Sequence, residues 1–246
     1  RVRVDRPWNG VMNNKGRAPA APLDASLVRR SRLALALSSG GARGLAHIGV
    51  LQVLEREGIA PGFVAGSSIG GLIGALHASG LPSHDLVAMA RNFRFPRRFL
   101  PGRLLDWEQI FPSVAVALPD TFEDLRTPLA LAATDIEEGC QVVLHTGGLL
   151  PAVRATCAIP GVLRPERIGG RWLVDGAVVN GLPVDLAWMA EPDFVIAVHV
   201  GGPRTRRMPQ LVWRMTGLLS RFRRFVPSPV AAKISYEMVV RTAEIL

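Results

Sequence analysis

The sequence predicts an α/β fold in which helices cover both faces of a mainly parallel sheet and so form three layers. Short apolar runs alternate with segments of helical spacing, and glycine-rich loops join the first two runs to the helices that follow them. The length of 246 residues suits one such domain, and an apolar fraction of 48% can supply a large core. We expect that domain at residues 32–246, after a flexible leader or packed extension at residues 1–31.

The first predicted unit is a strand, a loop and a helix. The apolar run Leu33–Leu37 indicates a buried strand, and the glycine-rich segment 38–44 follows it directly. Apolar side chains then recur at helical spacing from Leu45 to Leu54, and Gly58 is placed to end that helix. A loop between a strand and a helix can present bare N–H groups to an anion.

Three kinds of anion-binding loop lie between a strand and a helix, and only one of them fits segment 38–44. The dinucleotide motif Gly-x-Gly-x-x-Gly does not fit, because Ser39 occupies its first position and no acidic residue closes a second strand about twenty residues on. The Walker motif does not fit either, since no Gly-Lys-Ser/Thr follows the loop. An oxyanion hole remains, with the N–H groups near Gly40, Gly41 and Ala42 as donors.

The second strand-to-helix junction carries the sequence Gly66-Ser67-Ser68-Ile69-Gly70. A Gly-x-Ser-x-Gly pattern is typical of a nucleophile elbow, a strained turn that needs small neighbours around its serine. Ser68 is therefore the candidate nucleophile, and the helix that begins beside it favours negative charge near its hydroxyl. The same five residues also fit an ordinary tight turn, so the elbow needs support from other motifs.

The middle of the chain continues the alternation of strands and helices. The short apolar runs 129–134 and 141–144 are separated by Glu137-Glu138-Gly139, which predicts a hairpin at one side of the sheet. Segment 150–158 then has helical character and ends before Pro160-Gly161.

The strand Trp172–Val174 ends at Asp175, which precedes a glycine turn. Open α/β sheets display catalytic side chains at such strand ends. An aspartate has a reference pKa of about 3.9 and is a poor base in water, but desolvation and contact with a serine hydroxyl make it competent. A plain Asp-Gly turn is the alternative interpretation.

The last predicted elements are a helix that begins at Pro183 and a buried strand over Phe194–Val200. His199 lies in that strand and is the only one of five histidines placed late enough for a triad in the order Ser, Asp, His. A histidine in a buried strand is more often structural than catalytic, which favours Asp175 as the base.

Three motifs occur in the order Gly-Gly-x-Arg-Gly, Gly-x-Ser-x-Gly and Asp-Gly-Ala, and together they resemble those of the patatin-like phospholipase family. The likeness extends to segments 45–51, 158–161 and 174–184, and so covers roughly residues 32–200. It is strongest to the bacterial branch related to the catalytic domain of neuropathy target esterase. Ser38 and Ser39 depart from the pattern, because many members carry glycines there.

The resemblance implies a three-layer, patatin-like α/β/α fold and a serine acyl hydrolase that cleaves fatty-acyl esters of phospholipids or lysophospholipids. It implies a Ser-Asp dyad without histidine, in which Ser68 is the nucleophile and Asp175 the base. The loop of Gly40, Gly41, Ala42 and Arg43 would form the oxyanion hole. Arg43 either contacts a lipid phosphate or braces the loop, and its place within the turn favours bracing. The alternatives are a His199-dependent esterase and a regulatory or adaptor protein on a hydrolase fold.

The charge balance predicts attraction to polyanions. The chain has 29 Lys and Arg against 20 Asp and Glu, a formal net charge of +9. No nucleic-acid-binding motif or stacking array is present, so we expect no nucleic-acid partner. Segments 91–100 and 204–225 interleave arginine with apolar or aromatic residues, which favours peripheral contact with an anionic membrane. An ordinary helix with one solvated arginine face is the alternative.

The remaining signals concern location and cofactors. No eighteen apolar residues run together, so we expect a cytoplasmic protein with at most peripheral contact at the inner membrane face. Cys140 and Cys157 are too few for a disulfide framework and are predicted to be buried thiols. No residues have metal-ligand spacing, so neither a metal nor another cofactor is expected. The last residues have helical character, which predicts a C-terminal truncation.

Overall fold

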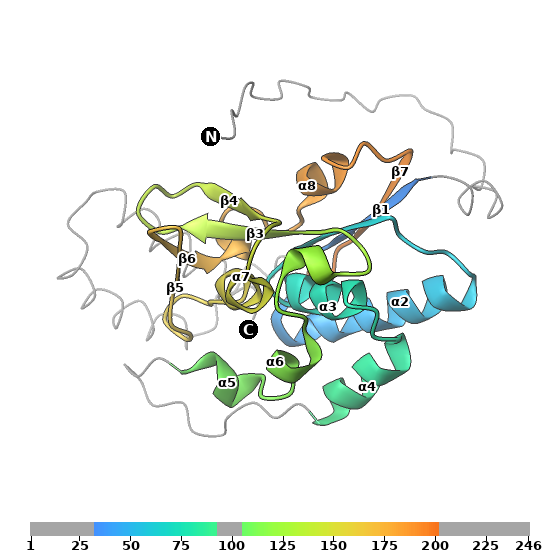
Figure 1. Cartoon of the computed structure of the whole chain (residues 1–246), viewed down its shortest axis with the longest axis horizontal. Helices are drawn as coiled ribbons and strands as arrows, with labels where there is room; N and C mark the ends of the chain where they lie inside the picture. The colour runs from blue at the N-terminus through green and yellow to red at the C-terminus, as the bar shows by residue number, and fades with distance from the viewer. Residues whose placement is uncertain (1–31, 93–104, 202–246) are drawn as a thin grey trace, which may run out of the picture.

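A seven-stranded mixed sheet forms the middle layer of the computed structural model, which describes residues 32–92 and 105–201 (Figure 1). The strands are β1 (Leu33–Leu37), β2 (Phe63–Ser67), β3 (Leu129–Asp135), β4 (Gln141–Leu144), β5 (Glu166–Ile168), β6 (Arg171–Asp175) and β7 (Phe194–Val198). Their order is β5-β6-β3-β2-β1-β7, and β4 also pairs with β3. The pairs among β7, β1, β2 and β3 are parallel, whereas β4, β5 and β6 pair antiparallel. The predicted α/β class with a mainly parallel sheet is confirmed.

Helices cover both faces of this sheet. They are α2 (Ala46–Arg56), α3 (Ile69–Ala78), α4 (Ser83–Asn92), α5 (Trp107–Ile110), α6 (Val114–Ala117), α7 (Leu149–Thr156) and α8 (Val184–Trp188), with 3-10 turns η1 (Gly41–Leu45), η2 (Phe122–Asp124) and η3 (Gly176–Val178). Figure 1 shows α8 over one face, and α2, α3 and α7 against the other. In the ranges described, no helix is long and apolar enough to cross a bilayer.

The alternating sequence of β1 explains how one sheet serves two different layers. Successive side chains of a strand point to opposite faces. Leu35 and Leu37 belong to the large core that α2, α3 and α7 cover. Ala34 and Ala36 point the other way and pack with Leu186 of α8. The small alanines let the five-residue α8 lie close to the strands, while the leucines fill the thicker layer.

Strands β2 and β6 meet end to end along β3. β2 pairs with residues 129–132 of β3, and β6 pairs with residues 133–135. β4 pairs with residues 131–134, so it overlaps both. A strand has only two hydrogen-bonding edges, so β2 and β6 must share the edge opposite β4. Because β2 runs parallel to β3 and β6 antiparallel, their carboxyl ends point toward each other.

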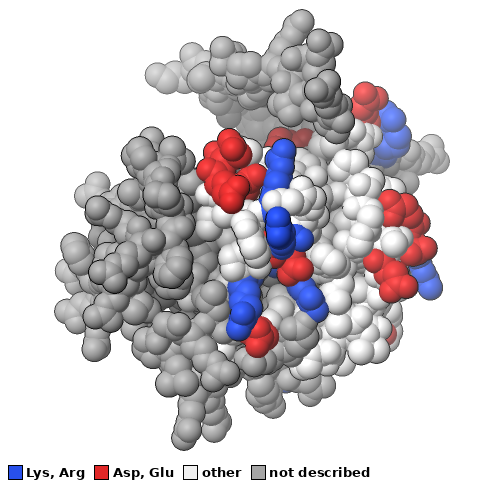
Figure 2. Space-filling model, turned by 60° about the vertical axis from the view of Figure 1, so that its left-hand side comes forward, with Lys and Arg blue, Asp and Glu red and all other residues white. Residues whose placement is uncertain are grey.

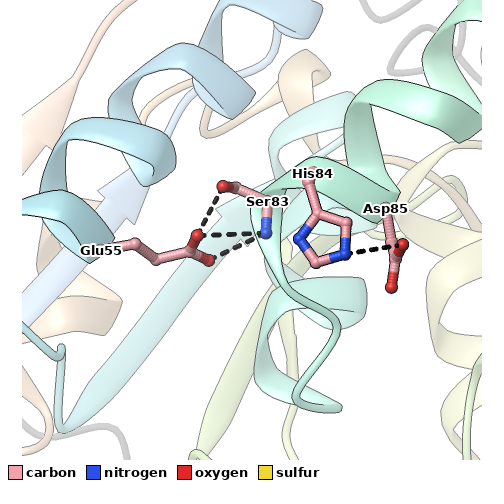
Figure 3. Close-up of polar contacts among 4 residues, drawn as sticks. All are labelled: Glu55, Ser83, His84 and Asp85. Atoms are coloured by element: carbon pink, nitrogen blue, oxygen red, sulfur yellow. Dashed lines mark hydrogen bonds and ion pairs between the residues drawn. The ribbon is translucent and has the colours of Figure 1, made fainter.

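The first turn of α4 is held by α2 (Figure 3). The Glu55 carboxylate accepts the Ser83 N–H at 2.9 Å and also the Ser83 hydroxyl. A carboxylate at this place satisfies an N–H that the helix leaves unpaired and complements the helix dipole. The neighbouring His84 Nε2 lies 3.1 Å from Asp85 Oδ1, but both side chains are exposed, so this contact adds little stability.

Most predicted elements are present, and two details of the prediction were wrong. Gly58 and Gly139 adopt positive φ at the predicted helix end and hairpin. The run expected to be a buried strand over Phe194–Val200 forms a strand only to Val198, and its side chains are half-buried or exposed. Among the described strands, β7 pairs with β1 alone. Cys140, predicted to be buried, is exposed beside the hairpin, whereas Cys157 is buried. The predicted segments 1–31 and 204–225, and most of 91–100, lie outside the described residues.

Candidate active site

Ser68 occupies a strained turn between β2 and α3. Its φ of 54° and ψ of −128° place it in a region that costs a non-glycine residue about 1–3 kcal/mol. Glycine is required on both sides of it. A Cβ on Gly70 would lie 2.4 Å from the Leu37 carbonyl oxygen, and one on Gly66 would lie 2.5 Å from the Gly71 Cα. The segment therefore has the geometry of a nucleophile elbow.

The Ser68 hydroxyl donates a hydrogen bond to Asp175 Oδ2, with 2.6 Å between the oxygens. Both side chains are buried, with 4% and 2% of their surface exposed. The Ala177 N–H donates to the other carboxylate oxygen at 2.8 Å. Each oxygen of Asp175 thus holds one donor, which orients the carboxylate toward the serine.

Burial raises the pKa of Asp175 from 3.8 to about 7. The hydrogen bonds from Ser68 and the Ala177 N–H act in the opposite direction, because they stabilise the charged form. A carboxylate with a pKa near neutrality is a far better proton acceptor than an exposed aspartate. The arrangement can therefore remove the hydroxyl proton without a histidine.

The loop predicted to form an oxyanion hole lies against the elbow. Gly40 precedes η1, and Gly41, Ala42 and Arg43 form its first turn. A Cβ on Gly44 of the same turn would lie 2.1 Å from the Ile69 side chain, so this turn packs on the residue after Ser68.

Within that loop, the backbone of Arg43 closes the turn. Its N–H donates to the Gly40 carbonyl at 3.1 Å and closes the turn. This N–H is committed to the loop itself, which leaves the N–H groups of Gly41 and Ala42 as the better candidates for contact with an oxyanion. Arg43 is exposed and makes further interactions.

Ser38 and Ser39 tie this loop to its neighbours. The Ser38 hydroxyl accepts the Val200 N–H at 3.0 Å and donates to the Ser39 carbonyl. The Ser39 N–H donates to the Gly181 carbonyl at 2.8 Å, in the loop that follows Asp175. The Ser38 side chain thus links this loop to the segment after β7, and the Ser39 backbone links it to the segment after Asp175.

His47, the buried histidine of α2, braces the same loop. Its Nε2 lies 2.8 Å from the Ser38 carbonyl oxygen. A carbonyl can only accept, so Nε2 carries the proton. Burial lowers the pKa of His47, which keeps the ring neutral. His47 is therefore a structural residue in this geometry.

His199 does not join the dyad, although the next residue, Val200, contacts the predicted oxyanion loop. His199 follows β7 and is exposed, whereas Ser68 and Asp175 are buried. Strand β1 lies between β7 and β2 in the sheet. The structure thus brings Ser68, Asp175 and the loop of residues 40–43 together, and no contact described here joins His199 to them. In the described ranges, no three His, Cys, Asp or Glu residues are grouped to hold a metal ion.

Sequence reasoning missed the residues at the end of α7. Thr156 and Cys157 contact the backbone of Ser68, and Ala158 contacts that of Asp175. The only signal in the sequence was the neighbouring segment 158–161, which is part of the family resemblance but does not by itself indicate a contact with the dyad.

Comparisons with known proteins agree with the family resemblance of the sequence motifs. The family model described as patatin-like phospholipase matches residues 35–188. An uncharacterised NTE family protein of Mycobacterium tuberculosis is 39% identical over 178 residues, which is 70% of this chain and 49% of that protein. Human patatin-like phospholipase domain-containing protein 6 is 33% identical over 192 residues, 72% of this chain and 14% of that protein. Neuropathy target esterase sws of Drosophila melanogaster is 34% identical over 69% of this chain and 13% of its own length. The chain thus spans about half of the mycobacterial relative and a small part of the animal ones.

Proposed function

The chain belongs to the patatin-like phospholipase family, and from this premise we propose that it is a serine acyl hydrolase acting through a Ser68–Asp175 dyad. Its substrates are fatty-acyl esters of phospholipids or lysophospholipids. The observation that carries the proposal is the 2.6 Å hydrogen bond between the Ser68 hydroxyl and a carboxylate whose pKa burial raises to about 7.

The reaction begins with transfer of the Ser68 proton to Asp175 while the serine oxygen attacks the ester carbonyl carbon. The tetrahedral intermediate collapses, the ester C–O bond breaks, and the leaving alcohol takes the proton from Asp175. Water then attacks the acyl-serine, with Asp175 again accepting a proton, and the fatty acid leaves. Ser68 recovers its proton from Asp175, so the cycle consumes one water per ester.

The negative charge of each tetrahedral intermediate needs donors that are already in place. The N–H groups of Gly41 and Ala42 are the proposed donors, supported by the packing of η1 on Ile69 beside the nucleophile. Gly40 and Arg43 shape the turn that presents them. The N-terminus of α3 adds a favourable field at the same place.

Peripheral membrane contact is proposed from the distribution of charge along the chain. Residues 32–92 and 105–201 contain nine arginines, no lysine and 16 acidic residues. On the face that Figure 2 shows, the basic side chains are interleaved with acidic ones. The other 20 basic residues, with only four acidic ones, fall in segments 1–31, 93–104 and 202–246. Any attraction to an anionic bilayer therefore comes from these segments rather than from residues 32–92 and 105–201, in which acidic residues outnumber basic ones.

Active-site labelling with a fluorophosphonate, followed by a panel of phospholipid and lysophospholipid substrates, tests the proposal. We expect the reagent to modify Ser68 and the Ser68→Ala variant to resist labelling while remaining folded. Fatty acid release from the panel should disappear in the same variant. A folded wild-type protein that neither labels nor hydrolyses any ester would favour the regulatory or adaptor alternative.

A further inference from the structure

The strained backbone of Ser68 is held from outside the elbow by the end of α7. The Ser68 N–H donates to Thr156 Oγ1 at 2.9 Å, and the Thr156 hydroxyl donates in turn to the Ala132 carbonyl at 2.6 Å. The hydroxyl thus uses its proton and a lone pair in one fixed orientation. Thr156 has no exposed surface, so water does not compete for these bonds. The amide of the nucleophile is connected in this way to the central strand β3.

The next two residues continue the contact. The Cys157 thiol donates to the Ser68 carbonyl oxygen at 3.3 Å. Burial raises the pKa of Cys157, with the nearby Asp175 charge adding to the effect, so the thiol keeps its proton and remains a donor. The Ala158 carbonyl accepts the Asp175 N–H at 3.0 Å. Three consecutive residues therefore contact the backbones of both members of the dyad.

We propose that residues 156–158 form the positioning element that fixes Ser68 against Asp175, with Thr156 as its principal residue. The proposal rests on the function proposed above, because it assigns these residues a task in that reaction. Ser68 at positive φ would relax if its amide lost its partner, and a displacement of about 1 Å at a reacting atom can lower a rate about 100-fold. The bond to Thr156 also commits the Ser68 N–H, which therefore does not serve as an oxyanion donor.

The side chain of Thr156 contributes in two ways, through the packing of its methyl group and through the hydrogen bonds of its hydroxyl. Its methyl carbon packs against α3, where a Cβ on Gly71 would lie 2.9 Å from it. Thr156→Val keeps the methyl packing and removes the hydroxyl. Thr156→Ser keeps the hydroxyl and removes the methyl. If positioning by hydrogen bonds is the function, the serine variant is the active one of the pair.

The test compares these two variants in the full chain, using fluorophosphonate labelling of Ser68 and hydrolysis of a soluble short-chain ester. We expect Thr156→Val to lower both the labelling rate and kcat by about 10- to 100-fold, with KM changed by no more than about threefold. Thr156→Ser should stay within about threefold of wild type. The acid limb of the Thr156→Val pH profile should move to higher pH, because a displaced Ser68 hydroxyl no longer holds down the pKa of Asp175.

Ser83→Ala is the matched control for stability. It also removes a buried hydroxyl with a hydrogen-bond partner, Glu55, but at the start of α4 (Figure 3). It should lower the melting temperature without changing the labelling rate or the pH profile. If Thr156→Val does not fold, Thr156→Cys replaces the hydroxyl with a weaker donor and should label at a rate between wild type and one-tenth of it.

Two results would overturn the proposal. One is a folded Thr156→Val, or Thr156→Cys in its place, that labels as fast as wild type. The other is a Thr156→Ser as slow as Thr156→Val, because packing rather than hydrogen bonding would then explain the loss. Failure of the proposed Ser68–Asp175 mechanism would give a different result. In that case the wild-type protein would not label at Ser68, or Ser68→Ala would still hydrolyse the ester.

Discussion

Ser67 and Asp175 pair with adjacent residues of β3, although the strands that carry them run in opposite directions. Ser67 lies opposite Ala132, and Asp175 lies opposite Ala133. The residue after Ser67 therefore emerges beside the residue that ends β6. The 107 positions between Ser68 and Asp175 in the sequence are bridged by a single strand. A substitution that alters the pairing of β3 should consequently change the distance between Ser68 and Asp175 even where the turns around the two residues stay intact.

We expect Ser68→Ala and Asp175→Asn each to lower kcat for ester hydrolysis by about 1,000-fold or more. The two side chains act as one unit, so the double variant should be scarcely slower than either single one. Steady-state hydrolysis of a short-chain ester measures this, with circular dichroism as the check on folding. Losses that multiply in the double variant would show that the two residues act independently.

His199→Ala should retain wild-type activity, because His199 is exposed, whereas Ser68 and Asp175 are buried against each other. It is the matched control for Asp175→Asn in the same ester assay. Activity that survives Asp175→Asn but disappears in His199→Ala would support the histidine-dependent esterase instead.

The pH dependence of kcat/KM should report the ionisation of Asp175 in the free enzyme. Asp175 must be charged to accept a proton, and burial raises its pKa to about 7. We therefore expect kcat/KM to rise with pH to a plateau, with a midpoint near 7. A midpoint near 4 would mean that the carboxylate is solvated in the working enzyme.

The same burial should make the wild-type protein less stable as the pH rises. The pKa of Asp175 is 3.8 as an ordinary group and about 7 in the fold, so the folded state keeps a proton that the unfolded state loses between these values. The stabilisation from that proton is complete below pH 4 and lost as the pH passes 7. A shift of about three units corresponds to up to about 4 kcal/mol of unfolding free energy.

Denaturant unfolding of wild type and Asp175→Asn from pH 4 to pH 8 measures this effect. Asparagine does not titrate, so the variant should gain stability relative to wild type across that range. Parallel stability curves for the two proteins would contradict a strongly raised pKa.

The catalytic motifs could be predicted because each depends on local chemistry at the end of a strand. A serine between two glycines indicates a tight turn, and Gly70 is in fact too close to the Leu37 carbonyl for any side chain. An apolar run that ends in Asp-Gly likewise indicates a carboxylate at a sheet edge. Gly58 and Gly139 were identified by the same local argument and have the positive φ expected of them.

The remaining features depend on contacts between distant segments, which periodicity does not encode. Nothing in the residues of β6 indicates that it runs antiparallel to β3 and meets β2. Thr156 lies 88 positions from Ser68, and a threonine at a helix end has many ordinary explanations. The exposure of His199 was mispredicted because the run before it is as apolar as a central strand, whereas β7 lies at the end of the order of the described strands.

Our last prediction concerns the basic segments that lie outside the described residues. The wild-type protein should bind phosphatidylglycerol vesicles more tightly than phosphatidylcholine vesicles. Replacing Arg221, Arg223 and Arg224 with glutamine should weaken the binding to phosphatidylglycerol vesicles. Each arginine near an anionic surface contributes about 1 kcal/mol, and salt screens this attraction. Cosedimentation at low and high salt measures the difference.

The matched control removes the same number of positive charges from the described part of the chain. Arg32, Arg56 and Arg164 each lie within 4.0 Å of an acidic group, namely Asp193, Glu57 and Asp106. Their replacement by glutamine should reduce vesicle binding less than the first triple variant, because their charge is already balanced locally. Both variants should hydrolyse a soluble ester at the wild-type rate, since none of the six residues belongs to the proposed site. Equal loss of binding in the two triple variants would show that net charge alone governs the attraction. Unchanged vesicle binding in the variant of Arg221, Arg223 and Arg224 would assign these residues to an ordinary solvated surface.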